Sequence, residues 1–246
     1  MALPESIDIA RAAVLAIDLH RGYLDPSVSN RPIPEHKART VLDANERLFA
    51  LARSVGMPVI HAVLSPDNLR GQRDERFQNP FFRWKASQGS VRLPMIDVQR
   101  LPAARGGGDI HPRLAPQPGE VLIDSKSSMS CFYGTELERA IRILGVDSLI
   151  IGGINTNTCV QCAAFDCFNR HLQAIVVQEC VTTDYGDDLH EPALENIRRC
   201  LGWVATLDEV QAALVAASPD PTHEHLGPAD RSGKSVAGRS RLRVIR

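Results

Sequence analysis

The sequence has little of what would mark a membrane, nucleic-acid-binding or disulfide-stapled protein. It holds 28 Lys and Arg against 29 Asp and Glu, and a net charge of -1 creates no field that would attract a polyanion. No apolar run approaches the roughly 20 residues that cross a bilayer, and the first residues lack the basic and apolar blocks of an export signal. Six cysteines in 246 residues are too few for a disulfide framework. We therefore expect a cytoplasmic protein with reduced thiols, and neither nucleic acid nor a membrane among its partners.

Short apolar runs recur along the chain, and helical patterns separate several of them. Runs of this kind are typical of strands that are buried on both faces of a parallel sheet. The sequence therefore predicts an α/β fold with six candidate strands. They are residues 13–17, 58–64, 121–123, 149–151, 174–177 and, more weakly, 203–205.

Several patterns predict where helices begin and end. An apolar stripe predicts a helix that ends at Gly56, and its members are Val41, Asn45, Leu48, Ala52 and Val55. Thr135 and Glu138 have the spacing of a capping box. Pro192 is suited to the first position of a later helix, and Asp208 to the start of the last one.

Two stretches break this rhythm and define the expected domain organisation. Residues 65–119 are rich in Pro, Gly, Arg and Gln, far longer than an ordinary connection, and we expect them to form an insertion over the active face. Residues 217–246 have the composition of a flexible, solvated tail. We therefore expect a single domain over residues 1–216, followed by this tail.

Three chemically useful side chains follow predicted strands. Asp18 ends the first strand, Lys126 follows the third, and Cys159 follows the fourth after a pair of glycines. Because parallel strands end at one edge of a sheet, we expect the three to meet there. A thiol attacks as its thiolate, so we expect Asp18 to accept its proton, and Lys126 and a helix N-terminus at Cys159 to lower its pKa. Such a site suits acyl transfer.

Three linked motifs resemble those of the isochorismatase-like cysteine hydrolases in order and spacing. They are residues 14–19, Lys126 with residues 130–137, and residues 153–160, and the resemblance runs from about residue 12 to residue 215 without most of the insertion. It implies a three-layer α/β/α sandwich around a six-stranded parallel sheet, and a homo-oligomer, either a dimer or a tetramer. It also implies an Asp18, Lys126, Cys159 catalytic triad.

The same resemblance implies an oxyanion site in the loop before the nucleophile. It places a cis peptide between Ile154 and Asn155. The cis bond would turn the N–H of Asn155 toward the oxyanion, beside the N–H of Cys159. We further expect the substrate to contact His20, Tyr23, Phe132, Asn155 and Thr158.

Differences between branches of the family narrow the expected chemistry. Members that cleave isochorismate lack the nucleophilic cysteine, so Cys159 argues against that branch. Nicotinamidases carry an Asp-x-His metal site after the second strand, where this chain has none; His61 lies inside the strand, and the Asp109-Ile110-His111 tripeptide comes too late. We therefore expect neither a metal nor any other cofactor.

Residues 179–186 resemble the segment after the fifth strand in biuret hydrolases and N-carbamoylsarcosine amidohydrolase relatives. The prediction is a hydrolase that cleaves a C–N bond of a small ureide or carbamoyl compound through a thioester and releases ammonia. The alternatives are an amidase of a maleamate-like or nicotinamide-like acid amide, a dithiol oxidoreductase that uses Cys159 and Cys162, or a member that binds without catalysis.

Overall fold

A computed structural model describes residues 3, 7–28, 33–64, 79–81, 84 and 110–217. These residues form a six-stranded sheet in the order β3-β2-β1-β4-β5-β6, and every neighbouring pair is parallel. The strands are β1 (Ala12–Ile17), β2 (Val59–Leu64), β3 (Val121–Lys126), β4 (Ser148–Ile154), β5 (Gln173–Thr182) and β6 (Trp203–Ala205).

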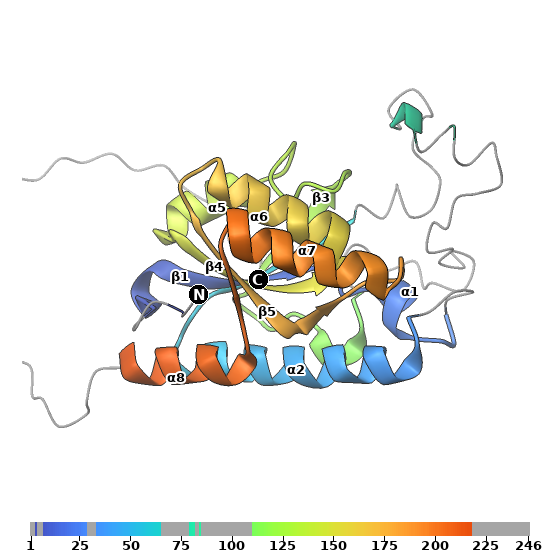
Figure 1. The fold of residues 1–246 in the computed structure, drawn as a ribbon. Helices are drawn as coiled ribbons and strands as arrows, with labels where there is room; N and C mark the ends of the chain where they lie inside the picture. The colour runs from blue at the N-terminus through green and yellow to red at the C-terminus, as the bar shows by residue number, and fades with distance from the viewer. Residues whose placement is uncertain are drawn as a thin grey trace, which may run out of the picture.

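Helices cover both faces of this sheet, which confirms the three-layer sandwich (Figure 1). The helices are α1 (Arg21–Leu24), α2 (Glu35–Ser54), α5 (Leu137–Leu144), α6 (Gln161–Phe168), α7 (Asp187–Cys200) and α8 (Leu207–Ala217). Shorter turns are η1 (Ile9–Arg11), η4 (Pro112–Leu114) and the π-helical η5 (Thr156–Val160). Helices α2 and α8 lie on one face, and α5, α6 and α7 lie on the other (Figure 1).

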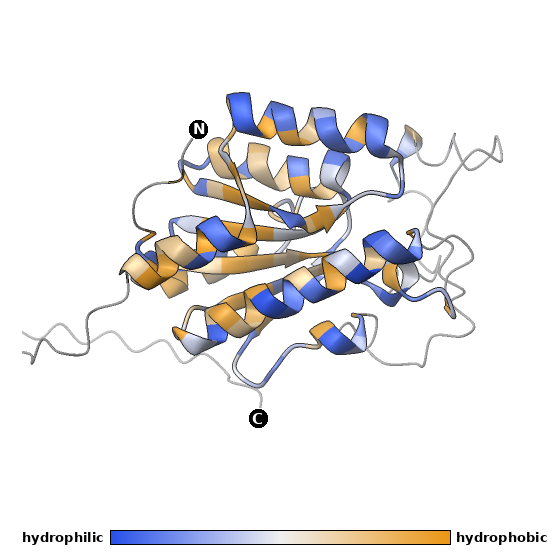
Figure 2. Cartoon of the chain, turned by 60° about the horizontal axis from the view of Figure 1, so that its bottom comes forward, coloured by the Kyte–Doolittle hydropathy of each residue, from blue (hydrophilic) through white to orange (hydrophobic). Residues whose placement is uncertain are grey.

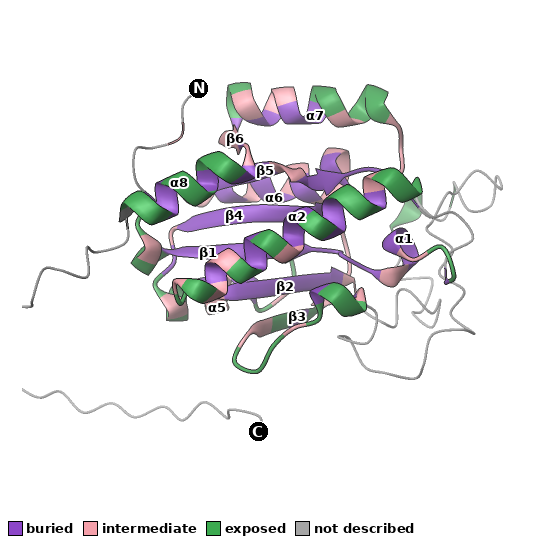
Figure 3. Ribbon diagram, turned by 90° about the horizontal axis from the view of Figure 1, so that it is seen from below, coloured by how far each residue is buried: buried purple, intermediate pink, exposed green. Residues whose placement is uncertain are grey.

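Strand β1 shows why one sheet needs two hydrophobic cores. All six of its residues are buried, and successive side chains point to opposite faces. Val14 packs in the core under α2 and α8, whereas Leu15 packs in the core under α5, α6 and α7. The strands are accordingly mostly hydrophobic in Figure 2, and in Figure 3 the central strands are buried while helices such as α2 and α8 have one exposed side.

The order of the strands predicts where a ligand-binding crevice would lie. The chain runs outward from β1 through β2 to β3, and then returns to β4 on the other side of β1. Loops that follow two such diverging strands separate, and ligands bind between them. The end of β1 and the end of β4 are therefore where a site is expected.

The six predicted strands are all present, but β3 and β4 are longer than predicted, and β5 extends furthest beyond its predicted range. Its register against β4 shifts, because Ile151 pairs with Val176 while Gly153 pairs with Val181. Asn45 of α2 donates from Nδ2 to the carbonyl of Cys180 at 2.9 Å, in the segment that the shift displaces. This contact explains the one polar residue in the predicted apolar stripe.

The predicted capping box is wrong, and a second one was missed. The hydroxyl of Thr135 accepts from the N–H of Leu137, and the Glu138 side chain turns away to Arg142. The reciprocal pair is instead Thr206 and Glu209: the Glu209 carboxylate accepts from the N–H of Thr206 at 2.7 Å, and the Thr206 hydroxyl accepts from the N–H of Glu209 at 3.1 Å. The Thr135/Glu138 and Thr206/Glu209 pairs have the same spacing in the sequence. Spacing alone therefore does not show which pair caps a helix, and in the first pair Arg142 binds the Glu138 carboxylate instead.

Two other predicted helix starts also differ from the structure. Helix α7 begins at Asp187, so Pro192 lies inside it and not at its first position. Two aspartates in the first turn favour this earlier start, because the helix dipole stabilises negative charge there. Helix α8 begins at Leu207, one residue before the predicted Asp208.

The predicted insertion and tail lie mostly outside the described residues. The end of the insertion is described, and it returns to the sheet: Ile110 forms an isolated bridge with His20, and the N–H of His111 donates to the carbonyl of Leu19 at 2.9 Å. None of the described helices is long and apolar enough to cross a membrane.

Candidate active site

Asp18 is held over the ends of β1 and β2 by a tight turn. It adopts a left-handed conformation with φ of 50°, which Asp tolerates better than most residues. Its N–H donates to the carbonyl of Ala62 at 2.9 Å, and its carbonyl accepts from the N–H of His20 at 2.7 Å. Its Oδ1 accepts from the N–H of Leu64 at 3.0 Å. These bonds fix a buried carboxylate at the carboxyl edge of the sheet.

Lys126 reaches this carboxylate from the edge of the sheet. It is the last residue of β3, paired in register with Leu64 of β2. Because β3 lies two strands from β1, roughly 10 Å away at ordinary strand spacing, only a long side chain can span the gap. Its Nζ lies 2.6 Å from Oδ2 of Asp18 and 3.4 Å from Sγ of Cys159. A fully buried ammonium thus connects the carboxylate and the thiol.

The end of β4 turns sharply, as its two glycines predict. Gly153 has φ of 143°, and a Cβ at this position would lie 2.3 Å from the carbonyl oxygen of Ile17. Only glycine fits that close approach. The peptide between Ile154 and Asn155 is cis, as the resemblance implies.

Cys159 does not begin an α-helix, contrary to prediction. It lies within the π-helical turn η5, and α6 begins two residues later at Gln161. The N–H of Val160 donates to the carbonyl of Asn155, which closes the wide turn. The hydroxyl of Thr158 lies 3.9 Å from Sγ of Cys159. The thiol is therefore presented from a widened turn and not from a free helix end.

The electrostatics of the three groups differ from the expectation at one point. Burial raises the pKa of Asp18, but the charge of Lys126 and the contact with His20 outweigh it and lower the pKa to about 2. Burial raises the pKa of Cys159 to about 12, despite the opposing effect of Lys126. The prediction of a lowered thiol pKa was wrong, because the nearby carboxylate of Asp18 offsets the ammonium and desolvation dominates. The resting site holds a thiol, a carboxylate and an ammonium.

The residues predicted to contact substrate lie in different surroundings. His20 and Tyr23 are buried beside Asp18, with their ring centroids 6.3 Å apart, and Thr158 adjoins the thiol. Phe132 is buried in the core under α5, α6 and α7, and the guanidinium of Arg170 lies 4.5 Å from its ring centroid. Its described contacts are therefore those of a packed side chain.

A loop after β5 completes the site, and sequence reasoning did not assign its residues. Oδ1 of Asn155 accepts from the N–H of Asp184 at 2.9 Å, and Oδ1 of Asn157 accepts from the hydroxyl of Thr183 at 2.7 Å. The N–H of Tyr185 donates to the Thr183 hydroxyl at 3.2 Å, and burial, Asp184 and Cys159 raise the pKa of Tyr185. The resemblance of residues 179–186 to other hydrolases was the available signal.

Comparison with known proteins identifies the family. A family model described as the isochorismatase domain matches residues 12–209, most of the chain. The chain belongs to the isochorismatase family. It is 28% identical to a ureidoacrylate amidohydrolase of Methylobacterium radiotolerans, over 89% of this chain and 85% of that protein. It is 29% identical to a maleamate amidohydrolase of Pseudomonas putida, over 83% of this chain and 87% of that protein.

The fold of this family member also matches solved structures. A cysteine hydrolase from Pseudomonas syringae pv. phaseolicola superposes with a TM-score of 0.65 and 22% identity, covering 89% of this chain and 100% of that chain. At this identity the likeness concerns the fold. It agrees with the parallel six-stranded sheet described above.

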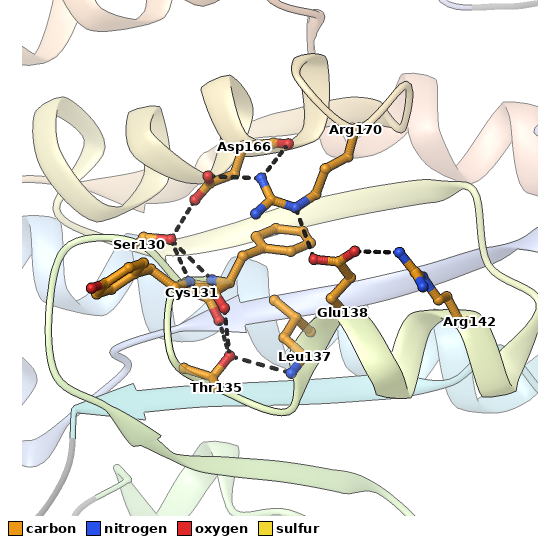
Figure 4. A network of polar contacts seen from close by, with 10 residues as sticks. Ser130, Cys131, Thr135, Leu137, Glu138, Arg142, Asp166 and Arg170 are labelled. Atoms are coloured by element: carbon orange, nitrogen blue, oxygen red, sulfur yellow. Dashed lines mark hydrogen bonds and ion pairs between the residues drawn. The ribbon is translucent and has the colours of Figure 1, made fainter.

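In this isochorismatase-family chain, a polar network joins the loop after β3 to α6 (Figure 4). The hydroxyl of Ser130 donates to Asp166 at 2.6 Å and accepts from the N–H of Phe132 at 3.1 Å. Arg170 donates to Asp166 at 3.0 Å, and the thiol of Cys162 lies 3.9 Å from the same carboxylate. Because Lys126 precedes this loop and Cys159 precedes α6, the network ties together the segments that carry two of the site groups.

The two histidines considered as metal ligands have structural contacts. Nε2 of His61 lies 3.0 Å from Oε2 of Glu120, and the residue is buried in β2. Nδ1 of His111 accepts from the N–H of Arg113, at the start of η4. Asp109 lies outside the described residues. Within the described parts of the chain, no group of three or more His, Cys, Asp or Glu is arranged to hold a metal ion.

Proposed function

We propose that this protein is a cysteine-dependent amidohydrolase that cleaves a C–N bond of a small ureide or carbamoyl compound through a thioester. Family membership and relatives named as amidohydrolases support hydrolysis of a non-peptide C–N bond. The observation that carries the cysteine mechanism is the contact chain from Sγ of Cys159 to Nζ of Lys126, at 3.4 Å, and on to Oδ2 of Asp18, at 2.6 Å.

The resting ionisation sets the first step. Because the pKa of Cys159 is raised and that of Asp18 is lowered, the thiol keeps its proton until it attacks. As the S–C bond forms, the proton passes from Sγ to the Asp18 carboxylate, and the carbonyl π electrons move to oxygen. The Lys126 ammonium lies beside both groups and stabilises the developing thiolate. The N–H groups of Asn155 and Cys159 receive the oxyanion.

The second half of the reaction returns every group to its starting state. The oxyanion collapses, the C–N bond breaks, and protonated Asp18 gives its proton to the leaving nitrogen. Water then attacks the thioester and gives a proton to Asp18. When the S–C bond breaks, that proton returns to Cys159. The net change is hydrolysis of one C–N bond, with one carboxylate serving as base and then as acid.

The relatives favour carbamoyl substrates and keep a second class open. One relative is named for ureidoacrylate, a ureido acid, and another for maleamate, an acid amide. The first falls in the proposed class, and the second supports an amidase of small carboxylic-acid amides as the alternative. Both reactions use the same thioester chemistry, so the substrate alone separates them.

A dithiol oxidoreductase has less support. Exchange with a disulfide needs a thiolate, which requires an acidic thiol. Burial raises the pKa of Cys159 to about 12 and that of Cys162 to about 11. The Cys162 thiol also faces the Asp166 carboxylate, which disfavours its anion.

A substrate panel with two matched cysteine variants tests the proposal. We expect ammonia release from one of biuret, ureido acids, N-carbamoyl amino acids, maleamate or nicotinamide, and no effect of EDTA. Cys159→Ser should lower kcat by about 10³-fold or more, as expected for loss of a nucleophile. Cys162→Ser, one turn away in the same helical segment, should keep near-normal turnover. Full activity in Cys159→Ser would exclude the thioester route, and loss confined to Cys162→Ser would favour the redox alternative.

A further inference from the structure

His20 lies in the candidate site, and the reaction described above does not use it. It follows Asp18 by two residues at the carboxyl edge of the sheet, and none of its surface is exposed. Neither ring nitrogen makes a hydrogen bond to the described residues, and the nearest approach is that of Nε2 to Oδ1 of Asp18, at 3.4 Å. Burying a polar ring without partners is costly, so its retention at this place calls for a function.

The backbone holds this ring in place. The N–H of His20 donates to the carbonyl of Asp18 at 2.7 Å, and its carbonyl accepts from the N–H groups of Tyr23 and Leu24 at 3.1 Å each. An isolated bridge to Ile110 adds a second strand of chain beside it. These contacts fix the backbone of His20 beside Asp18. The imidazole therefore approaches the carboxylate from the turn that carries both residues.

Several hydrogen-bond donors surround the two carboxylate oxygens of Asp18. Oδ2 accepts from Lys126, and Oδ1 accepts from the N–H of Leu64 while facing Nε2 of His20. An Asp side chain with a single donor on one oxygen can rotate about its terminal bond. Lys126 and the Leu64 N–H place one donor on each oxygen, and Nε2 of His20 would add a second donor at Oδ1. A further donor limits that rotation more closely, and this matters for a group that must take a proton from one atom and return it to another.

We propose that His20 is a positioning residue: its ring donates from Nε2 to Oδ1 of Asp18 and holds the carboxylate in the orientation that serves Cys159. The role rests on the proposed function, in which Asp18 exchanges the proton. The 3.4 Å contact is long for a hydrogen bond in the free protein, and contacts of this kind commonly tighten in the substrate complex.

The proposal makes the titration of Asp18 an independent readout. The contact with His20 contributes to the low pKa of Asp18, so its removal should raise that pKa. Other groups acting on Asp18 remain in place in a His20 variant. They are Lys126 from β3, the Leu64 N–H from β2, Tyr23 from α1, Cys159 from η5 and Cys131 from the loop after β3.

Three replacements of His20 distinguish the roles of its two ring nitrogens. The amide nitrogen of Gln can occupy the place of Nε2, and that of Asn can occupy the place of Nδ1. We expect His20→Met and His20→Asn to lower kcat/KM by about tenfold, the value of one net hydrogen bond, with His20→Gln retaining most of the activity. The Asp18 pKa, followed by NMR of carboxyl-labelled aspartate over the range in which the protein stays folded, should rise by about one unit in His20→Met and stay low in His20→Gln.

His61→Met provides the matched control. His61 is also a buried histidine facing a carboxylate, but its partner is Glu120, so this replacement should leave the Asp18 titration unchanged. Rescue by Asn and not Gln, or an unchanged Asp18 titration in His20→Met, would overturn the proposal. If His20→Met does not fold, the Gln and Asn variants decide the question. If no panel compound releases ammonia, the proposed function fails, whereas the NMR titration still tests the contact.

Discussion

The buried pair of Asp18 and Lys126 provides the sharpest test of the site, because its energetics do not depend on knowing the substrate. The two side chains are 1% and 0% exposed, and their charged atoms lie 2.6 Å apart. Asp18→Asn would leave a buried ammonium without its partner, and Lys126→Met would leave a buried carboxylate. Either single replacement should therefore lower the free energy of unfolding by about 3–5 kcal/mol.

The double variant, with both replacements, removes both charges at once. It should be much less destabilised than the sum of the two singles, because neither charge remains unpaired. We expect a coupling free energy of about 3 kcal/mol, measured by urea unfolding at neutral pH for the four proteins of the cycle. Costs that add within about 0.5 kcal/mol would refute the pairing, and with it the ionisation states on which the proposed reaction depends.

Three further predictions follow from the same contacts. Because the pKa of folded Asp18 is lowered to about 2, below its unfolded value, the pair should contribute about 2 kcal/mol at neutral pH that is lost as pH falls from about 4 toward about 2. In urea unfolding across this range, the loss of stability should be about 2 kcal/mol larger in the wild type than in the neutral double variant, because other carboxylates titrate in both proteins. Gly153→Ala should lower the free energy of unfolding by about 3 kcal/mol or more, because its Cβ would meet backbone 2.3 Å away. Gly56→Ala, with φ of 71° and open space around it, should lower it by only about 1 kcal/mol. Thermal unfolding of both variants would check the contrast, and equal costs would contradict it. Thr206→Ala should lower stability by about 1 kcal/mol through loss of the α8 cap, with ammonia release unchanged; a denaturation midpoint equal to wild type would show that the cap is not formed.

Much of the site followed from the sequence because strand ends are predictable in a parallel sheet. Asp18 directly follows an apolar run, Lys126 and Cys159 each lie in the segment after one, and the structure brings all three within direct or shared contact. The glycine turn and the cis peptide before Asn155 were also predicted. Their catalytic roles stay proposals until the variants are measured.

The parts that sequence could not supply depend on residues far apart in the chain. The second half of β5 was missed because polar residues interrupt its pattern, and the register shift there is accompanied by a hydrogen bond from Asn45, 135 positions away from Cys180. The wrong capping box has a similar origin, since Arg142 and Arg170 bind the Glu138 that was expected to cap.

The sequence by itself determined the class of fold and which reactive side chains meet at the site, because apolar runs must be buried and the carboxyl ends of parallel strands share an edge. Tertiary structure alone decided the ionisation of that chemistry. The pKa of Cys159 is raised and not lowered, because burial and the carboxylate of Asp18 outweigh the ammonium of Lys126. The sequence predicted His20 as a substrate contact, and only its complete burial beside Asp18 gave the basis for the positioning role proposed above. Desolvation and the distances between charges are set by packing, and packing exists only once the chain has folded.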